Sequence, residues 1–239
     1  MKYADYIRQI EIDSLWNGRK HIKWELDRNV NILSGVNGVG KTTILNKVTS
    51  LLHKHETLLQ EDSTIEDADF HKIGNVKLDF VPEDATGIHY GVIQKFTIEP
   101  DAILEELEKK YIKYPDERKE EFYDILDSLF CSTDKTVLRG EKGVRLVQEG
   151  DVLTFRELSS GEKQMLLIML TVLLQDKKPY VLFMDEPELS LHLDWQKRLI
   201  DIITQLNPNV QLILTTHSPA IIMNGWTDKV TEVSEITVH

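Results

Sequence analysis

Gly35-Val36-Asn37-Gly38-Val39-Gly40-Lys41-Thr42 is the stretch of this chain that identifies its fold class. Its outer glycines enclose four residues and precede lysine and threonine, which is the spacing of a phosphate-binding loop. Such a turn lets backbone N–H groups surround a triphosphate where side chains would obstruct it. Lysine adds charge for the phosphates, and threonine offers a hydroxyl to Mg²⁺. The residues expected to hold the nucleotide are Asn37, Gly38, Val39, Gly40, Lys41, Thr42 and Thr43.

The residues that flank this loop support the assignment. Residues 29–33 form a short apolar run that is typical of a strand. Residues 43–52 carry apolar side chains at helical spacing. A strand, a glycine loop and a helix in that order confirm a phosphate site, and the helix would direct the positive end of its dipole at the ligand. The alternative is a glycine-rich turn that binds nothing, and this context disfavours it.

Composition restricts the class of protein. The chain has 239 residues, of which 41% are hydrophobic and 28% charged, enough for one large α/β domain or two small ones. No apolar run approaches the ~20 residues of a membrane helix, and the amino terminus has no apolar signal core. We therefore expect a cytoplasmic protein without membrane insertion. The net charge of −12 opposes broad nucleic-acid binding, but a local basic groove stays possible, so direct DNA binding is left open.

We treat residues 1–239 as a single α/β domain with three regions. Residues 1–100 predict an antiparallel β-subdomain that carries the phosphate loop, with a hairpin turn at Asn17-Gly18. Residues 101–135 predict a two-helix insertion, too short for a long coiled-coil arm. Residues 136–239 contain the remaining motifs. The strands expected in the first region are residues 6–12, 21–26, 29–33, 76–80 and 91–98.

Two further apolar runs end in polar residues. Residues 180–186 end in Asp185 and Glu186, and residues 210–215 are followed by His217. Near-continuous apolar runs are typical of buried parallel strands, whose carboxyl ends form the edge where α/β folds bind ligands. We expect the aspartate to hold Mg²⁺, the glutamate to act as general base on water, and the histidine to donate to the γ-phosphate. A purely structural role is the alternative for the histidine.

The stretch Leu158-Ser159-Ser160-Gly161-Glu162 precedes a strongly apolar helix. One of its serines is expected to cap that helix, and Gly161 to let the backbone approach another group closely. Two interpretations stay open: a capped core helix, or a second element that contacts phosphate. Gln94, in the strand expected at residues 91–98, is either a ligand of Mg²⁺ or water, or a surface polar residue.

Together, four motifs resemble those of the ABC-type ATPases and occur in that family's order: residues 35–43, 158–162, 185–187 and 215–219. The resemblance implies an ABC-type P-loop fold, with a mostly parallel central sheet flanked by helices, that binds and hydrolyses ATP with Mg²⁺. It also implies a head-to-tail homodimer around two ATP molecules, in which Ser159, Gly161 and Glu162 contact the ATP of the opposite copy. The roles implied are catalysis for Lys41, Glu186 and His217, and metal binding for Thr42, Asp185 and Gln94.

Departures from the transporter pattern indicate a branch of that family. Ser160 stands where transporter subunits usually carry glycine, and Glu162 where they usually carry glutamine. With the run Glu-Pro-Glu-Leu-Ser-Leu-His at residues 186–192, they are more similar to the soluble SMC-, RecF- and OLD-like ATPases and to small ATPases of bacterial anti-phage systems. Asp194 resembles part of the loop that crosses the dimer seam.

This branch implies a nucleotide switch that controls a separate effector protein, such as a nuclease or toxin of an anti-phage system. Three alternatives stay open. The chain resembles, more weakly, the nucleotide-binding subunit of an ABC transporter. It is also similar to ATPases of DNA repair or chromosome maintenance, although its acidic balance and short insertion oppose that reading. A scaffold that binds ATP without turnover is the third, and Glu186 argues against it.

Overall fold

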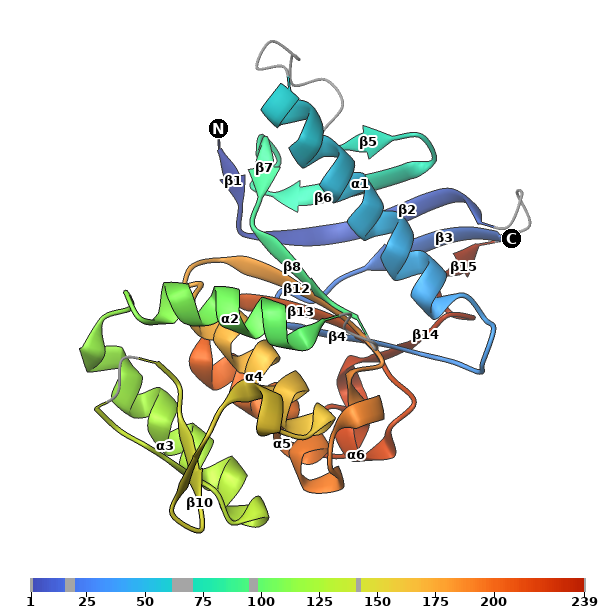
Figure 1. The fold of residues 1–239 in the computed structure, drawn as a ribbon. Helices are drawn as coiled ribbons and strands as arrows, with labels where there is room; N and C mark the ends of the chain where they lie inside the picture. Colours follow the sequence, from blue (N-terminus) through green and yellow to red (C-terminus); the bar gives the residue numbers. More distant parts are fainter. Residues whose placement is uncertain (1, 16–19, 62–70, 95–98, 141–142, 239) are drawn as a thin grey trace. The chain divides into compact units, whose positions relative to one another are not determined.

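The computed structural model describes residues 2–15, 20–61, 71–94, 99–140 and 143–238. The chain forms two compact units (Figure 1). The first unit comprises Met1–Gln94, Pro179–Pro187 and Asn209–His239, and the second comprises Lys95–Lys178 and Glu188–Pro208. The hairpin turn predicted at Asn17-Gly18 and the last residues of the strand predicted at 91–98 lie outside the described residues. The division of the chain into three consecutive regions stays a prediction.

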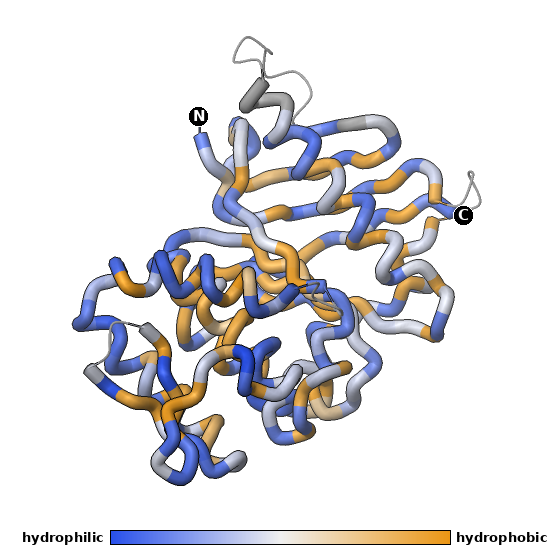
Figure 2. Tube along the Cα trace, viewed as in Figure 1, coloured by the Kyte–Doolittle hydropathy of each residue, from blue (hydrophilic) through white to orange (hydrophobic). Residues whose placement is uncertain are grey.

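A parallel sheet forms the centre of the first unit. Its strand order is β14-β4-β13-β12-β8, and every pairing is parallel. All residues of β12 and β13 are buried, as their unbroken apolar runs predicted. Figure 2 shows hydrophobic residues gathered along these strands. The strands span Val30–Ser34 (β4), Tyr90–Ile93 (β8), Tyr180–Asp185 (β12), Val210–Thr215 (β13) and Val230–Glu232 (β14).

A second sheet of the first unit is antiparallel, with strand order β15-β3-β2-β6-β5. Side chains alternate between its faces, so that Ile10, Ile22 and Trp24 are buried while their neighbours along the strands are more exposed. The antiparallel ribbon predicted before the phosphate-loop strand is confirmed. The strands span Tyr6–Leu15 (β2), Lys20–Glu25 (β3), Lys72–Ile73 (β5), Val76–Val81 (β6) and Thr237–Val238 (β15); a separate parallel pair joins Tyr3–Ala4 (β1) to Gly87–Ile88 (β7).

One buried amide joins the two sheets of this unit. Gln211 of β13 is fully buried. Its Nε2 donates to Ile7 O at 2.8 Å and to Asp27 O at 2.9 Å, and its Oε1 accepts from Ile7 N at 2.8 Å. Helix α1 (Lys41–Glu61) contributes Ile44, Val48 and further apolar residues to the core shared with the antiparallel sheet. The first unit thus encloses a core between α1 and the sheets.

The second unit is mainly helical. Helix α4 packs against α2 and α5, and α3 packs against α5. Trp195 Nε1 donates to Leu129 O at 3.2 Å, which ties α5 to α3. The two helices predicted within residues 101–130 are confirmed. The helices span Pro100–Tyr111 (α2), Lys119–Phe130 (α3), Ser160–Leu173 (α4) and Leu193–Leu206 (α5), and the strands Thr136–Val137 (β9), Leu146–Gln148 (β10) and Asp151–Leu153 (β11).

Short elements complete the chain. One is helix α6 (Pro219–Ile222), where Ser218 Oγ accepts from Ala220 N at 3.2 Å. The 3₁₀ helices are Asp116–Arg118, Cys131–Thr133, Phe155–Glu157, Pro187–Ser190 and Thr227–Lys229. Across the described residues, we find no helix with the length and apolar character needed to cross a bilayer.

Candidate nucleotide site

The phosphate loop connects β4 to α1 in the first unit, as the strand, loop and helix pattern predicted. Gly38 has a φ of 80° and Gly40 a φ of 112°, conformations that L side chains rarely adopt. The helical hydrogen bonds begin at once, because Ile44 N donates to Gly40 O at 2.9 Å. The loop therefore opens directly onto a helix amino terminus, which favours an anion.

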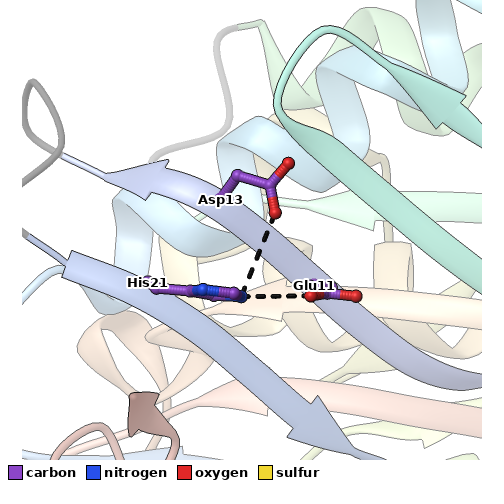
Figure 3. Close-up of side chains that lie close together, drawn as sticks. All are labelled: Glu11, Asp13 and His21. Atoms are coloured by element: carbon purple, nitrogen blue, oxygen red, sulfur yellow. Dashed lines mark hydrogen bonds and ion pairs between the residues drawn. The ribbon is translucent and has the colours of Figure 1, made fainter. Parts of the chain in front are cut away.

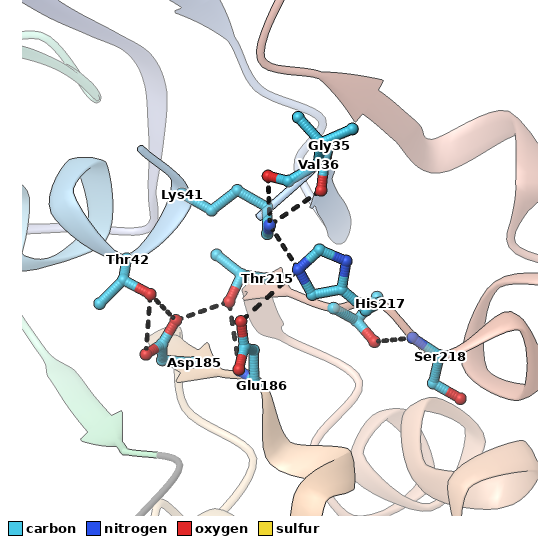
Figure 4. A network of polar contacts seen from close by, with 10 residues as sticks. Gly35, Val36, Lys41, Thr42, Asp185, Glu186, Thr215, His217 and Ser218 are labelled. Atoms are coloured by element: carbon cyan, nitrogen blue, oxygen red, sulfur yellow. Dashed lines mark hydrogen bonds and ion pairs between the residues drawn. The ribbon is translucent and has the colours of Figure 1, made fainter. Parts of the chain in front are cut away.

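Lys41 is held inside the loop by its ammonium group. The residue is 5% exposed, and its Nζ lies 2.9 Å from Gly35 O and 2.6 Å from His217 Nε2 (Figure 4). An ammonium group only donates hydrogen bonds, so Nε2 must accept, which places the ring proton on Nδ1. The structure thus joins the lysine of the loop to the histidine that follows β13.

Two hydroxyl groups converge on the carboxylate of Asp185. Thr42 Oγ1 lies 2.9 Å from Oδ1 and 3.1 Å from Oδ2. Thr215 Oγ1 donates to Oδ1 at 2.7 Å (Figure 4). Asp185 ends β12 and Thr215 ends the neighbouring β13, and the two residues are paired in register. The sheet register therefore places Thr215 beside Asp185, the predicted metal-binding aspartate. Helix α1 brings Thr42, the predicted metal-binding threonine, to the same carboxylate.

Glu186 follows β12 in an uncommon backbone conformation, with a φ of 45°. Its N–H donates to both Oγ1 and the carbonyl oxygen of Thr215, each at 3.1 Å. Its Oε1 lies 3.7 Å from His217 Nε2. Because Nε2 accepts from Lys41, it has no proton to give to Glu186, and this approach is not a hydrogen bond. The structure brings together Lys41, Thr42, Asp185, Glu186 and His217.

The other residues expected at the site lie around this cluster. Gln94 is exposed and directly follows β8. Ile93, the last residue of β8, is paired with Met184 of β12. The next residues along the two parallel strands are Gln94 and Asp185, which therefore lie at the same level. Asn37 is exposed in the loop, and Val39 is partly buried against the core. Thr43 lines a cavity of about 400 Å³ beside α1. Their contacts with a nucleotide stay predictions.

In the second unit, Ser159 and not Ser160 caps α4. Ser159 Oγ accepts from Glu162 N at 3.3 Å, and Glu162 Oε2 accepts from Ser159 N at 2.8 Å, which is a complete capping box. Lys135 Nζ lies 3.0 Å from Glu162 Oε1, and both side chains are buried. Burial raises the pKa of Glu162, but the hydrogen bonds from Ser159 and Lys135 outweigh it and hold the pKa below its usual range.

Gly161 makes the close backbone approach that its position predicted. A Cβ atom there would lie 2.3 Å from Ser190 O, well inside van der Waals contact. The group approached is therefore the carbonyl that ends the 3₁₀ helix Pro187–Ser190. Whether this segment also contacts phosphate stays a prediction.

The geometry can be set against known proteins. The protein family AAA_21, described as "AAA domain, putative AbiEii toxin, Type IV TA system", matches residues 48–224. The chain belongs to this family. A curated relative is the Retron Vc95 probable ATPase of Vibrio cholerae serotype O1 biovar El Tor, 26% identical over 102 residues. That match covers 38% of this chain and only 20% of the relative.

Solved structures share the fold of this AAA_21 protein. The SMC head domain from Thermotoga maritima is 14% identical, with a TM-score of 0.55 over 97% of this chain and 94% of that chain. The Smc head domain bound to the C-terminal domain of ScpA, derived from Pyrococcus furiosus, is 15% identical, with a TM-score of 0.55 over 92% and 91%. A nucleotide-free ATP-binding cassette from an ABC transporter is 17% identical, with a TM-score of 0.50 over 92% and 85%.

These comparisons establish the class of the AAA_21 chain. Its fold is the α/β P-loop fold of SMC heads and ABC ATPases, which confirms the resemblance drawn from the motifs. The family and the fold together indicate an ATPase of the P-loop class.

Two residues of these sites were missed from sequence. Thr215 belongs to an apolar strand and to the motif at residues 215–219, but no role of its own was predicted for it, although it is a hydroxyl residue at the end of the strand next to that of Asp185. Lys135 lies in a charged stretch before the β9 strand, and nothing in its sequence neighbours indicates Glu162 as a partner. The role of Thr215 could have been found from the pairing of the two strands, whereas the contact of Lys135 with Glu162 can be seen only in the folded chain.

Another polar cluster of the AAA_21 chain lies on the exposed face of the antiparallel sheet. His21 Nε2 is 3.1 Å from Glu11 Oε1 and 4.0 Å from Asp13 Oδ1 (Figure 3). These are ligand types that metals accept. Lys72 Nζ also lies 3.8 Å from Asp13 Oδ2. We interpret the cluster as polar contacts between side chains of different strands, which are common on solvent-facing sheets.

Proposed function

We propose that this protein hydrolyses ATP with Mg²⁺ and uses ATP-driven dimerisation as a switch. The observation that carries the proposal is the single connected cluster at the carboxyl edge of the parallel sheet. There Lys41 contacts His217, Thr42 contacts Asp185, and Glu186 lies beside the histidine. Lysine, metal-binding oxygens, a carboxylate base and a histidine are the groups that phosphoryl transfer requires around a phosphate loop.

The residues present fit a magnesium ion. Mg²⁺ binds oxygen ligands and is usually held by one or two carboxylates or hydroxyls together with phosphate and water. Thr42 Oγ1 and Asp185 Oδ1 are 2.9 Å apart at the mouth of the loop, and Gln94 follows the neighbouring strand. Bound there, the ion would neutralise charge on the β- and γ-phosphates.

Lys41 and His217 would exchange partners when ATP binds. The ammonium group now donates to His217 Nε2. A triphosphate in the loop would draw that ammonium group to its own oxygens, because charge-assisted bonds to phosphate are stronger than bonds to a neutral ring. His217 would then carry its proton on Nε2 and donate a hydrogen bond to the γ-phosphate. Glu186, 3.7 Å from the same nitrogen, would polarise the attacking water as general base.

The dimer would be completed by the second unit of the opposite copy. Ser159, Gly161 and Glu162 form a capped helix amino terminus, which is suited to contact phosphate. Leu189 and Leu193 are each 54% exposed and stand close in sequence to Asp194, which resembles part of a dimer seam. Exposed apolar side chains would be covered in such a contact. These features support a head-to-tail pair of chains around two ATP molecules.

We further propose that the dimer controls a separate effector protein, a nuclease or toxin of an anti-phage system. Two findings support this role. The family description reads "putative AbiEii toxin, Type IV TA system", and a relative is described as a "Retron Vc95 probable ATPase". Affinity purification of tagged chain with the product of an adjoining gene, with and without ATP, tests the partnership. A permease recovered as the partner would instead support a transporter subunit.

The switch itself is tested with Glu186→Gln. The variant should slow hydrolysis by about 10²–10⁴-fold, because it removes the general base, and should retain bound ATP. Light scattering should then show a stable dimer with ATP and Mg²⁺. Lys41→Ala is the control and should bind no ATP and stay monomeric. ATP-bound Glu186→Gln that remains a monomer would contradict the dimer, and unchanged ATP affinity in Lys41→Ala would contradict the site.

A further inference from the structure

We propose that Thr215 is a positioning residue that holds both acidic residues of the site through one hydroxyl group. This inference rests on the proposed ATPase function and concerns the same site. Thr215 is the last residue of β13, is 0% exposed, and is paired in register with Asp185 of β12. Its place in the sheet therefore puts the hydroxyl beside the aspartate and next to the first peptide group after β12.

The hydroxyl group of Thr215 uses its donor and an acceptor position on two different residues. Its proton is given to Asp185 Oδ1 at 2.7 Å, and its oxygen accepts the N–H of Glu186 at 3.1 Å. A hydroxyl has one proton and two lone pairs, so a single group can make both bonds. Valine has nearly the same shape but can make neither.

The first bond sets the rotation of the Asp185 carboxylate. Oδ1 accepts from Thr215 on one side and from Thr42 on the other, the latter at 2.9 Å. Groups that orient a ligand carboxylate govern how well it holds a metal, and their loss typically lowers metal affinity or activity about 10- to 100-fold. Thr215 would thus keep Asp185 aimed at the ion that Thr42 shares.

The second bond holds the backbone of Glu186. With a φ of 45°, this residue lies in the left-handed region, which disfavours a glutamate. Such conformations persist where surrounding contacts over-determine them, and they cluster at functional sites. Here Thr215 supplies two acceptors for the same N–H, its Oγ1 and its carbonyl oxygen. Loss of the hydroxyl would let Glu186 relax and move its carboxylate away from the attacking water.

The test compares Thr215→Val with Thr215→Ser, which keeps the hydroxyl. Mn²⁺ is the metal probe, because its binding to the ADP complex can be followed by electron paramagnetic resonance without turnover. In Thr215→Val, we expect Mn²⁺ affinity and kcat each to fall about 10- to 100-fold, while the affinity for ADP without metal stays unchanged. Thr215→Ser should restore both quantities.

Thr216→Val is the matched control. Thr216 is equally buried, and its hydroxyl accepts from Ser218 N at 2.9 Å. It should lower the melting temperature as Thr215→Val does but leave Mn²⁺ affinity unchanged. If Thr215→Val does not fold, Thr215→Ala removes the same hydroxyl without placing a methyl group against Glu186 N.

The outcomes separate this inference from the proposed function. Wild-type protein that binds neither ADP nor Mn²⁺·ADP would overturn both. Wild-type protein that binds Mn²⁺·ADP, together with a folded Thr215→Val or Thr215→Ala variant of unchanged Mn²⁺ affinity and kcat, would overturn only the role of Thr215. Equal losses in Thr215→Val and Thr216→Val would show that a buried hydroxyl at this end of β13 acts only through stability, and would also overturn the role of Thr215.

Discussion

The phosphate site of the first unit and the capped segment of the second unit are held in opposite ways. The phosphate site is assembled from distant parts of the chain, since Thr42 and Asp185 are 143 residues apart and Lys41 and His217 are 176 apart. The capped segment closes on itself, with Ser159 and Glu162 three residues apart. The first therefore depends on sheet register, while the cap of the second is defined within one helical turn.

This comparison predicts that the second unit can be weakened without loss of the phosphate site. The largest effect is expected for Lys135→Met, which leaves the buried carboxylate of Glu162 without its cation. Breaking a buried ion pair in this way costs about 3 kcal/mol in the free energy of unfolding. Urea unfolding measures the loss, and calorimetry should show unchanged ADP affinity at temperatures where the variant is folded.

Lys197→Met provides the control for this variant. Lys197 pairs with Asp194 at 3.0 Å on the exposed side of α5, and surface pairs contribute about 0–1 kcal/mol. Adding Glu162→Gln to Lys135→Met should recover part of the stability, because no buried charge then remains unpaired. If Lys135→Met is as stable as Lys197→Met, the segment is not held by its ion pair.

A smaller effect is expected for Gly161→Ala. The added methyl group would lie 2.3 Å from Ser190 O. Its position is fixed by the backbone of residue 161, and the Ser190 carbonyl is itself backbone, so neither can rotate away. Overpacking costs about 1–3 kcal/mol, and the gain in helix propensity of up to about 1 kcal/mol offsets only part of it. Urea unfolding measures the change. Ser160→Ala, at the exposed neighbouring position, should stay within about 0.5 kcal/mol of wild type.

If Gly161→Ala is as stable as Ser160→Ala, the contact with Ser190 is looser than the structure shows. If a folded Gly161→Ala variant loses ATP-dependent dimerisation but keeps its ADP affinity, the phosphate site binds nucleotide independently of the capped segment.

The smallest effect is expected for pH, because the stability that Glu162 contributes through the capping box decreases in acid. The pKa of Glu162 is lowered in the folded chain, so its contribution is complete above the pKa of an unfolded glutamate, about 4.3. That contribution is lost as pH falls through the lower pKa of the folded chain. The stability difference between wild type and Glu162→Gln should therefore shrink as pH falls from about 5 to 3. A difference that grows with acid would contradict the assigned direction.

The elements that the sequence predicted are those with strong local signals. The glycine loop between β4 and α1, the unbroken apolar runs of β12 and β13, and the helices of residues 101–130 follow from spacing and composition. The closeness of Lys41 and His217 could be anticipated only as a shared edge of a parallel sheet. Their direct contact at 2.6 Å could not, because it depends on how far each strand extends.

What the sequence did not predict depends on pairing between distant segments. β8 was expected among the strands of the antiparallel region, but it pairs parallel to β12. The prediction was wrong because a short apolar run does not indicate which strand it will pair with. Thr215 acquires its two partners only from the register of β13 with β12. Lys135 acquires Glu162 only when the β9 region and α4 come together.

Gln211 couples the two sheets of the first unit through hydrogen bonds. Its amide donates to and accepts from the backbone of Ile7, so it completes for β2 the pair of hydrogen bonds that a neighbouring strand would make. The same β13 strand ends four residues later at Thr215, beside both acidic residues. Sliding of β13 past β2 would break both hydrogen bonds between Gln211 and Ile7. A shift of the β13 end would therefore be resisted by, and transmitted to, the antiparallel sheet.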